Sequence, residues 1–187
     1  MQKIILASQS PRRKQLLEWA EIDFDVIVSN ADESFPPNLP FEDAAIFIAR
    51  NKAVAIADSH GKELPVLAAD TIVVCDEQVI GKPETREQAI EFLSRLAGNT
   101  HRVITGVCLL AKQGEIAFAD VTTVSFHPLT QQQIIFYVDK YQPFDKAGAY
   151  AIQEWIGVVG IKAIEGDFYN VMGLPVSRVV QALQGLE

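Results

Sequence analysis

The sequence predicts a mixed α/β protein, with a central sheet flanked by helices, from two features of the chain. Short apolar runs of strand length alternate with longer segments whose apolar residues recur at helical spacing. Residues 101–110 and 116–126 are strand-like runs joined by Gln113-Gly114, which is typical of an antiparallel hairpin within a mixed sheet. With 187 residues, 49% of them hydrophobic, the chain can build one sizeable core, so a single domain over residues 1–187 is expected.

The N-terminal stretch predicts a strand, a tight turn and a helix. Residues 3–7 are an apolar run typical of a buried strand, and a helix is expected over about residues 11–20. Ser10 is a good N-cap, and Pro11 suits the first helical turn because no N–H is needed there. Cations at residues 12–14 occupy a turn where the helix dipole disfavours positive charge. Two interpretations stay open, a solvated basic turn and an anion site at the helix N-terminus.

The next segment predicts a strand over residues 24–28, a loop over 29–40 and a long helix over 41–59. The loop contains Glu33. Carboxylates in loops are usually solvated, but they are also the ligands that a metal site needs. Lys52 lies on the long helix, where most lysines keep their ammonium groups in water.

Residues 65–75 form an apolar run that Asp70 and Thr71 interrupt. Burying a lone carboxylate is costly, so Asp70 is expected to be ion-paired, hydrogen-bonded, metal-bound or at a cleft. The alternative is an aspartate that caps a bend, with Thr71 as an ordinary strand residue. We favour the first interpretation, because an apolar run has little other reason to contain this pair.

The second half of the chain predicts further strands and helices. Residues 79–83 are expected to form a short return strand, and residues 158–164 another strand. The capping-box pattern Thr-x-x-Gln opens the segments 85–96 and 130–141, which are expected to be helices. A last helix is expected to begin at residues 174–175.

Composition excludes several classes of protein. The net charge of −8 argues against non-specific binding to nucleic acid or an anionic membrane. No apolar run approaches the roughly 18 residues of a membrane span, and no export leader is evident. Cys75 and Cys108 lie in apolar runs, as expected for reduced, packed thiols. We therefore expect a soluble, cytoplasmic protein with no nucleic-acid or membrane partner.

The remaining polar residues indicate phosphate chemistry. The three histidines and two cysteines are too scattered for a zinc site, and no Gly-x-Ser-x-Gly elbow occurs. The candidate cations are Arg12, Arg13, Lys52 and Lys82, and the candidate carboxylates are Glu33 and Asp70. Cations that hold phosphates, with carboxylates that hold a divalent cation, are typical of phosphate-ester or anhydride chemistry.

Six short motifs together resemble the Maf family of nucleoside triphosphate pyrophosphatases. In order they are Leu6-Ala-Ser-Gln-Ser-Pro-Arg-Arg13, Ala49-Arg-Asn-Lys-Ala53, Ala68-Ala-Asp-Thr71, Gly81-Lys-Pro83, His101-Arg-Val-Ile-Thr-Gly106 and Asp145-Lys-Ala-Gly-Ala-Tyr150. They span nearly the whole chain, and the ordered set is highly specific. The resemblance implies a fold similar to that of inosine triphosphatases, with an active cleft between two lobes.

The resemblance implies hydrolysis of a nucleoside triphosphate between the α and β phosphates, with Mg²⁺ or Mn²⁺ as cofactor. Asp70 matches the family's proton acceptor, which would activate water. The positions that match the phosphate-binding residues are Ser8, Arg13, Lys52 and Lys82. Glu33, together with Asp70, matches the surroundings of the metal. The implied products are a monophosphate and pyrophosphate.

Substrate choice is implied by three further positions. Arg12, Thr71 and Gln153 match the selectors of the branch that acts on dTTP and UTP, a class that could include modified pyrimidine nucleotides. An amide such as Gln153 can pair with the donor and acceptor edge of thymine or uracil. The sister branch, which acts on 7-methyl-GTP, tends to have a glutamate at that position. The next residue is Glu154, where a glycine is common in the family.

Two biological roles stay open at this point. One is an enzyme that removes surplus or non-standard nucleotides. The other is an interaction protein that affects cell division, because the family name records an association with septum formation. The resemblance also implies a homodimer as a candidate assembly, although no apolar stripe in the sequence demonstrates it.

Overall fold

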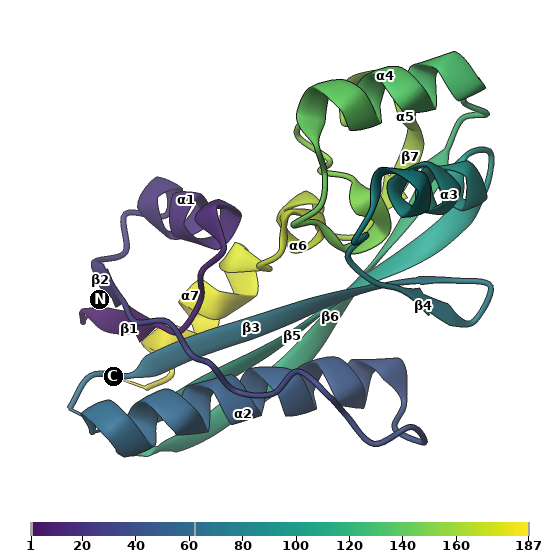
Figure 1. The fold of residues 1–187 in the computed structure, drawn as a ribbon. Coiled ribbons are helices and arrows are strands. Elements are labelled where there is room, and N and C mark those ends of the chain that lie inside the picture. The colour runs from purple at the N-terminus through teal and green to yellow at the C-terminus, as the bar shows by residue number, and fades with distance from the viewer. Residues whose placement is uncertain (1, 62, 187) are drawn as a thin grey trace. The chain divides into compact units, whose positions relative to one another are not determined.

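The computed structural model describes residues 2–61 and 63–186. In chain order the elements are β1 (Ile4–Leu6), α1 (Pro11–Trp19), β2 (Phe24–Val26), α2 (Phe41–His60), β3 (Val66–Cys75), β4 (Gln78–Ile80), α3 (Arg86–Leu96), β5 (Thr100–Ala111), β6 (Gly114–Phe126), α4 (Gln131–Tyr141), the 3₁₀ turn η1 (Ala147–Ala149), α5 (Trp155–Gly160), β7 (Ile161–Glu165), α6 (Phe168–Met172) and α7 (Val176–Gln184). Figure 1 shows their course.

The predicted fold class is confirmed by the strand pairing. The sheet has the order β2-β1-β3-β5-β6-β7, and β4 pairs with β3 outside this path. β1 runs parallel to both β2 and β3, whereas β3–β4 and β6–β7 are antiparallel pairs. The sheet is therefore mixed, as the hairpin in the sequence predicts.

The chain divides into two compact units. The first comprises Met1–Thr71, Thr105–Asp120 and Gly173–Glu187, and the second comprises Ile72–Ile104 and Val121–Met172. The strands β3, β5 and β6 contribute residues to both units.

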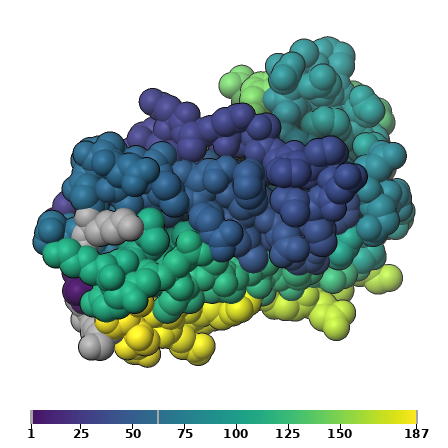
Figure 2. Space-filling view, turned by 90° about the horizontal axis from the view of Figure 1, so that it is seen from below, coloured from purple at the N-terminus to yellow at the C-terminus, as the bar shows by residue number. Residues whose placement is uncertain are grey.

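In the first unit, α2 packs closely against the sheet through small side chains. Ala49, Ala53 and Ala57 recur one helical turn apart, and they join a buried cluster with Ile5 and Ala68 of β1 and β3. Figure 1 shows α2 on one face of this part of the sheet and α1 with α7 on the other. In Figure 2 the outward side of α2, in blue, lies beside the green β5–β6 hairpin region.

A glycine of β5 is needed where α2 approaches the sheet. A Cβ atom built on Gly106 would lie 2.1 Å from the carbonyl carbon of Ala45 in α2. Real Cβ atoms essentially never approach backbone so closely, so only glycine fits here without moving the helix. This contact fixes the depth at which α2 sits on β5.

In the second unit, α3 and α4 pack against each other (Figure 1). Thr130 and Gln133 form the predicted reciprocal capping box at the start of α4. Thr85 likewise accepts a hydrogen bond from the N–H of Gln88, but the Gln88 side chain accepts from the N–H of Glu84 instead of Thr85. The predicted capping box at Thr85 is therefore only half formed, although the helix α3 is present.

The prediction of one strand over residues 158–164 is wrong in its first half. Residues 155–160 form the helix α5, and only Ile161–Glu165 form the strand β7. The N–H groups of Gly157 and Val158 both donate to the carbonyl of Glu154, at 2.9 and 3.3 Å. A Cβ on Gly157 would lie 1.7 Å from the Ile152 carbonyl oxygen, so this glycine permits a tight turn that overrides the β propensity of the valines. The short helix α6 was not predicted at all.

Three buried groups complete the description of the two cores. His101 is 2% exposed, its Nε2 lies 2.7 Å from the hydroxyl of Tyr150, and burial lowers its pKa to about 4. Cys75 and Cys108 are buried thiols, as expected, and burial raises the pKa of Cys108 to about 12. Across residues 2–61 and 63–186, none of the helices has the length and apolarity that a membrane span requires.

Candidate functional site

Lys52 connects two carboxylates in the first unit. Its Nζ lies 2.7 Å from Oδ1 of Asp70 and 2.7 Å from Oε1 of Glu33. The two carboxylate oxygens therefore lie within twice that distance of each other. The Lys52 and Asp70 side chains are only 10% and 13% exposed, whereas that of Glu33 is 54% exposed. We call Glu33, Lys52 and Asp70 the carboxylate–lysine cluster.

The burial of Lys52 follows from its place on α2. It lies three residues after Ala49 and four before Ile56, so it shares the helix face that packs on the sheet. The general expectation that a helix lysine keeps its ammonium in water is wrong for this residue. A buried ammonium needs a counter-charge, and Asp70 supplies it.

Asp70 and Thr71 lie within an unbroken strand. β3 runs from Val66 to Cys75 without a bend, so the alternative of an aspartate that caps a bend is wrong. Asp70 was expected to be ion-paired, hydrogen-bonded, metal-bound or at a cleft, and of these the structure shows the ion pair, with Lys52. Successive strand residues point to opposite faces, so Asp70 shares the α2 face with Ala68, and Thr71 points to the other face.

Arg13 forms hydrogen bonds on the face of β3 that points away from α2. Its guanidinium donates three hydrogen bonds, to Oγ of Ser8 at 3.2 Å, Oγ1 of Thr71 at 3.0 Å and the carbonyl of Gly173 at 2.8 Å. The Thr71 hydroxyl also shares a hydrogen bond of 2.9 Å with Thr105. We call these five residues the arginine cluster.

The turn before α1 presents Arg13 to this cluster. Ser10 is the N-cap, as predicted, and its side chain accepts from the N–H of Arg13, while Pro11 begins the helix. The N–H of Ser10 donates to Oγ of Ser8 at 3.1 Å. The basic first turn is therefore not simply solvated, because Arg13 is only 9% exposed. Arg12, in contrast, is half-buried.

Charges of both clusters influence one another. Burial lowers the pKa of Arg13, and the charge of Arg12 lowers it further. The negative charges of Asp70 and Glu33 act in the opposite direction and favour the guanidinium ion. The positive and negative site residues of this unit therefore share one electrostatic environment.

Two members of the arginine cluster were not predicted. Thr105 belongs to the motif His101-Arg-Val-Ile-Thr-Gly106, but the sequence alone indicates no role for it. Its signal in the sequence is a hydroxyl within the apolar strand β5, where it is 0% exposed. Gly173 contributes a backbone carbonyl, which no side-chain pattern could reveal.

Lys82 and Gln153 belong to the second unit, and both are exposed. Lys82 follows β4. The carbonyl of Gly81 accepts a hydrogen bond of 3.0 Å from the N–H of Gly148. The motifs Gly81-Lys-Pro83 and Asp145-Lys-Ala-Gly-Ala-Tyr150 are therefore in contact. Gln153 follows the buried residues Ala151 and Ile152 and directly precedes α5.

The donors of the carboxylate–lysine cluster fit a hard divalent cation. Within the described parts of the chain, no group of three or more His, Cys, Asp or Glu could hold a metal by itself. Glu33 and Asp70 nevertheless offer two neighbouring carboxylates around Lys52. Mg²⁺ is commonly held by one or two carboxylates together with waters and substrate phosphates, so this pair suits it.

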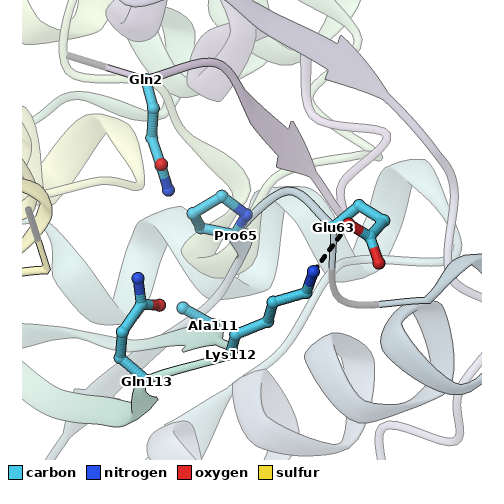
Figure 3. A pocket seen from close by; sticks show the side chains of 6 residues that line it. All are labelled: Gln2, Glu63, Pro65, Ala111, Lys112 and Gln113. Carbon is cyan, nitrogen blue, oxygen red and sulfur yellow. Dashed lines mark hydrogen bonds and ion pairs between the residues drawn. The ribbon is translucent and has the colours of Figure 1, made fainter.

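A small surface pocket of the first unit lies apart from these residues. It has a volume of about 50 Å³ and is lined by Gln2, Glu63, Pro65, Ala111, Lys112 and Gln113 (Figure 3). An ion pair of 2.7 Å joins Lys112 to Glu63 at its edge. None of the predicted site residues lines this pocket, which has room for only a few water molecules.

Comparison with known proteins places the chain in a family. The model of the family described as "Maf-like protein" matches residues 3–186. A Parabacteroides distasonis protein named dTTP/UTP pyrophosphatase is 46% identical, over 97% of this chain and 95% of its own length. Proteins with the same name from Bacteroides fragilis and Cytophaga hutchinsonii are 47% and 48% identical, over 98% and 97% of this chain and 96% and 83% of theirs.

A solved structure shares the fold. The structure of the Staphylococcus aureus Ham1 protein superposes with a TM-score of 0.56 at 17% identity, and the match covers 100% of both chains. At this level of identity the likeness concerns the fold alone. The match of the family model over residues 3–186, with relatives that are 46–48% identical, shows that this chain belongs to the family of Maf-like proteins.

Proposed function

We propose that this protein is a nucleoside triphosphate pyrophosphatase that hydrolyses dTTP and UTP to the monophosphate and pyrophosphate. Relatives that are 46–48% identical over nearly the whole chain have the name dTTP/UTP pyrophosphatase. The structural observation that carries the proposal is the buried contact of Asp70 with Lys52, with Glu33 on the same ammonium group. It supplies a fixed carboxylate, a cation and a second carboxylate in one place.

In the proposed reaction, water attacks the α phosphorus. A new bond forms between the water oxygen and this phosphorus, and the bond from the α phosphorus to the bridging oxygen breaks. The electron pair of that bond leaves with pyrophosphate. Asp70 accepts the proton of the attacking water. Because Lys52 holds its Oδ1, we assign this role to Oδ2.

The cations have the role of binding the phosphates. Lys52 is positioned by Asp70 and Glu33, and its ammonium can turn from a carboxylate to a phosphate oxygen without losing a negative partner. Arg13 uses three of the five N–H donors of a guanidinium on protein acceptors, and Ser8 is one of these. We propose that Ser8, Arg13 and Lys52, with Lys82, bind the phosphates.

Glu33 and Asp70 are the proposed ligands of Mg²⁺ or Mn²⁺. When bound, the cation would neutralise phosphate charge and polarise the phosphorus–oxygen bonds. Glu33 would hold it with an exposed carboxylate on the loop before α2. The selection of the base is assigned to Arg12, Thr71 and Gln153.

The reaction and the role of Asp70 can be tested together. Hydrolysis of dTTP in ¹⁸O-labelled water should place the label in the monophosphate, and label in pyrophosphate would exclude attack at the α phosphorus. Asp70→Asn should lower kcat by about 10²- to 10⁴-fold while the protein stays folded. A folded Asp70→Asn protein with wild-type activity would contradict the assignment of the proton acceptor.

Three further predictions stay predictions. They are that residues 1–187 act as a single domain, that the protein is cytoplasmic and that a homodimer is the candidate assembly.

A further inference from the structure

Glu154 lies at the centre of a polar network in the second unit. The hydroxyl of Tyr137, on α4, donates a hydrogen bond to Oε2 of Glu154. The same hydroxyl accepts a hydrogen bond of 3.2 Å from the N–H of Ala151. Nζ of Lys146 lies 3.6 Å from Oε1 of Glu154 and 2.7 Å from Asp145. One tyrosine hydroxyl therefore holds both ends of the segment 151–154.

The burial of Tyr137 and Lys146 contrasts with the exposure of Gln153. Tyr137 is 0% exposed and Lys146 is 8% exposed. Ala151 and Ile152 are also buried, whereas Gln153 is exposed. The structure thus fixes the residues on both sides of Gln153 and leaves its amide accessible.

The backbone of the segment is fixed as well. The N–H of Glu154 donates to the carbonyl of Ala151 at 3.1 Å, which closes a turn around Gln153. The N–H of Gly157 then donates to the carbonyl of Glu154 at 2.9 Å. Because a side chain at Gly157 would collide with the Ile152 carbonyl, the turn and the start of α5 are packed in backbone contact.

A fixed segment matters because an amide can pair with pyrimidines in two ways. Uracil and thymine present an acceptor (O4) beside a donor (N3–H), and cytosine presents a donor (N4–H₂) beside an acceptor (N3). The carboxamide of glutamine matches either edge, depending on which way its oxygen and nitrogen point. A freely rotating glutamine would therefore bind both kinds of base, and only a glutamine held in one orientation can discriminate between them.

We propose that Glu154, through Tyr137 and Lys146, is a positioning residue that fixes the backbone from which Gln153 reaches the base and thereby favours UTP and dTTP over CTP. This inference rests on the proposed function, in which Gln153 contacts the base. It adds a reason for the ion pair between the buried Lys146 and the half-buried Glu154, because a purely apolar contact between α4 and α5 would not orient the turn. A site can discriminate by hydrogen bonds only when its polar groups are held in place.

The test compares UTP, dTTP and CTP as substrates of variants that loosen the segment. Glu154→Ala removes the acceptor for Tyr137, and Tyr137→Phe removes the hydroxyl. Both should lower the ratio of kcat/KM for UTP to that for CTP by about tenfold, roughly the effect of losing one charge-assisted hydrogen bond. The ratio of dTTP to UTP should stay unchanged, because both bases present the same edge.

Two controls separate positioning from a general loss of structure. Glu154→Gln keeps an acceptor for Tyr137 and should retain more of the selectivity than Glu154→Ala. Glu91→Gln, at an exposed position on α3, should behave like the wild type. Hydrogen exchange provides a readout besides activity: the amide of Ala151 should exchange faster in Tyr137→Phe and Glu154→Ala.

The outcomes distinguish this inference from the proposed function. An unchanged ratio of UTP to CTP in active, folded Glu154→Ala and Tyr137→Phe proteins would overturn the inference and leave the proposed function intact. Unchanged exchange at Ala151 would also overturn it. A wild-type protein that hydrolyses neither UTP nor dTTP would overturn the proposed function, and this inference with it.

Discussion

Replacing Lys52 with methionine is expected to destabilise the protein because it leaves a buried carboxylate without its cation. Methionine is unbranched and fills a space similar to that of the lysine stem, so the change removes a charge with little change in packing. Asp70, which is 13% exposed, would keep its negative charge while losing the ammonium that lies 2.7 Å away. Glu33 is 54% exposed and can turn to water instead.

The size of the effect follows from this difference in exposure. Removing one partner of a buried ion pair typically costs 3–5 kcal/mol, and the partial exposure of Asp70 places Lys52→Met near the lower end, at about 3 kcal/mol. Changing Asp70 to asparagine as well removes the stranded charge. The double variant should therefore regain part of the stability that Lys52→Met loses.

Urea unfolding at neutral pH measures these differences, and α2 provides a matched control. Arg50 lies two residues before Lys52, and its guanidinium contacts Glu115 at 2.6 and 2.8 Å. This pair is 46% and 31% exposed, so Arg50→Met should cost less than about 1 kcal/mol.

The comparison can refute the reasoning. If Lys52→Met is no less stable than Arg50→Met, burial does not make the Lys52–Asp70 contact important for stability. If the double variant with Asp70→Asn is not more stable than Lys52→Met, the stranded carboxylate is not the cause of the loss.

Three other perturbations have defined outcomes. Gly106→Ala should cost about 3 kcal/mol or prevent folding, because its Cβ would lie 2.1 Å from a carbonyl carbon of α2; wild-type stability in urea would contradict this. Burial lowers the pKa of His101 from 6.5 to about 4. Between these two pH values the imidazole is protonated in the unfolded chain but neutral in the folded protein. Stability should therefore fall by up to about 3 kcal/mol as the pH drops from 6.5 to 4, and His101→Gln should remove this part of the pH dependence of unfolding. Chelation of divalent cations with EDTA should stop dTTP hydrolysis, and excess Mg²⁺ should restore it. Glu33→Gln should raise the Mg²⁺ concentration needed for the half-maximal rate. Full activity in EDTA would show that hydrolysis needs no divalent cation.

The elements with a strong local signal could be predicted from the sequence. The hairpin of β5 and β6 was found from two apolar runs around Gln113-Gly114, and α1 was found from Ser10 and Pro11. In each case the residues that decide the structure are neighbours in the chain. The helix α5 could not be found in this way, because its valines favour a strand and the deciding contact is the close packing of Gly157 on the Ile152 carbonyl.

The candidate site was predictable in its residue types but not in its contacts. Asp70 was identified because a carboxylate in an apolar strand needs a partner, yet the sequence did not say that the partner is Lys52. The periodicity of α2 places Lys52 on the buried face, and this signal could have been used. Arg13 donates its hydrogen bonds, and Thr105 contacts Thr71, only because α1, β3 and β5 pack together in the fold. These elements lie far apart in the sequence, so no local pattern predicts the contacts.

The most direct test of the proposed function is the initial rate of pyrophosphate release by the purified protein with Mg²⁺ from dTTP, UTP, CTP, GTP and 7-methyl-GTP. We predict the highest kcat/KM for dTTP and UTP, with the monophosphate as the second product. The fastest release from 7-methyl-GTP would contradict the assignment of Gln153 as a pyrimidine selector. Release of orthophosphate in place of pyrophosphate, or no turnover of any of the five nucleotides, would contradict the proposed reaction itself.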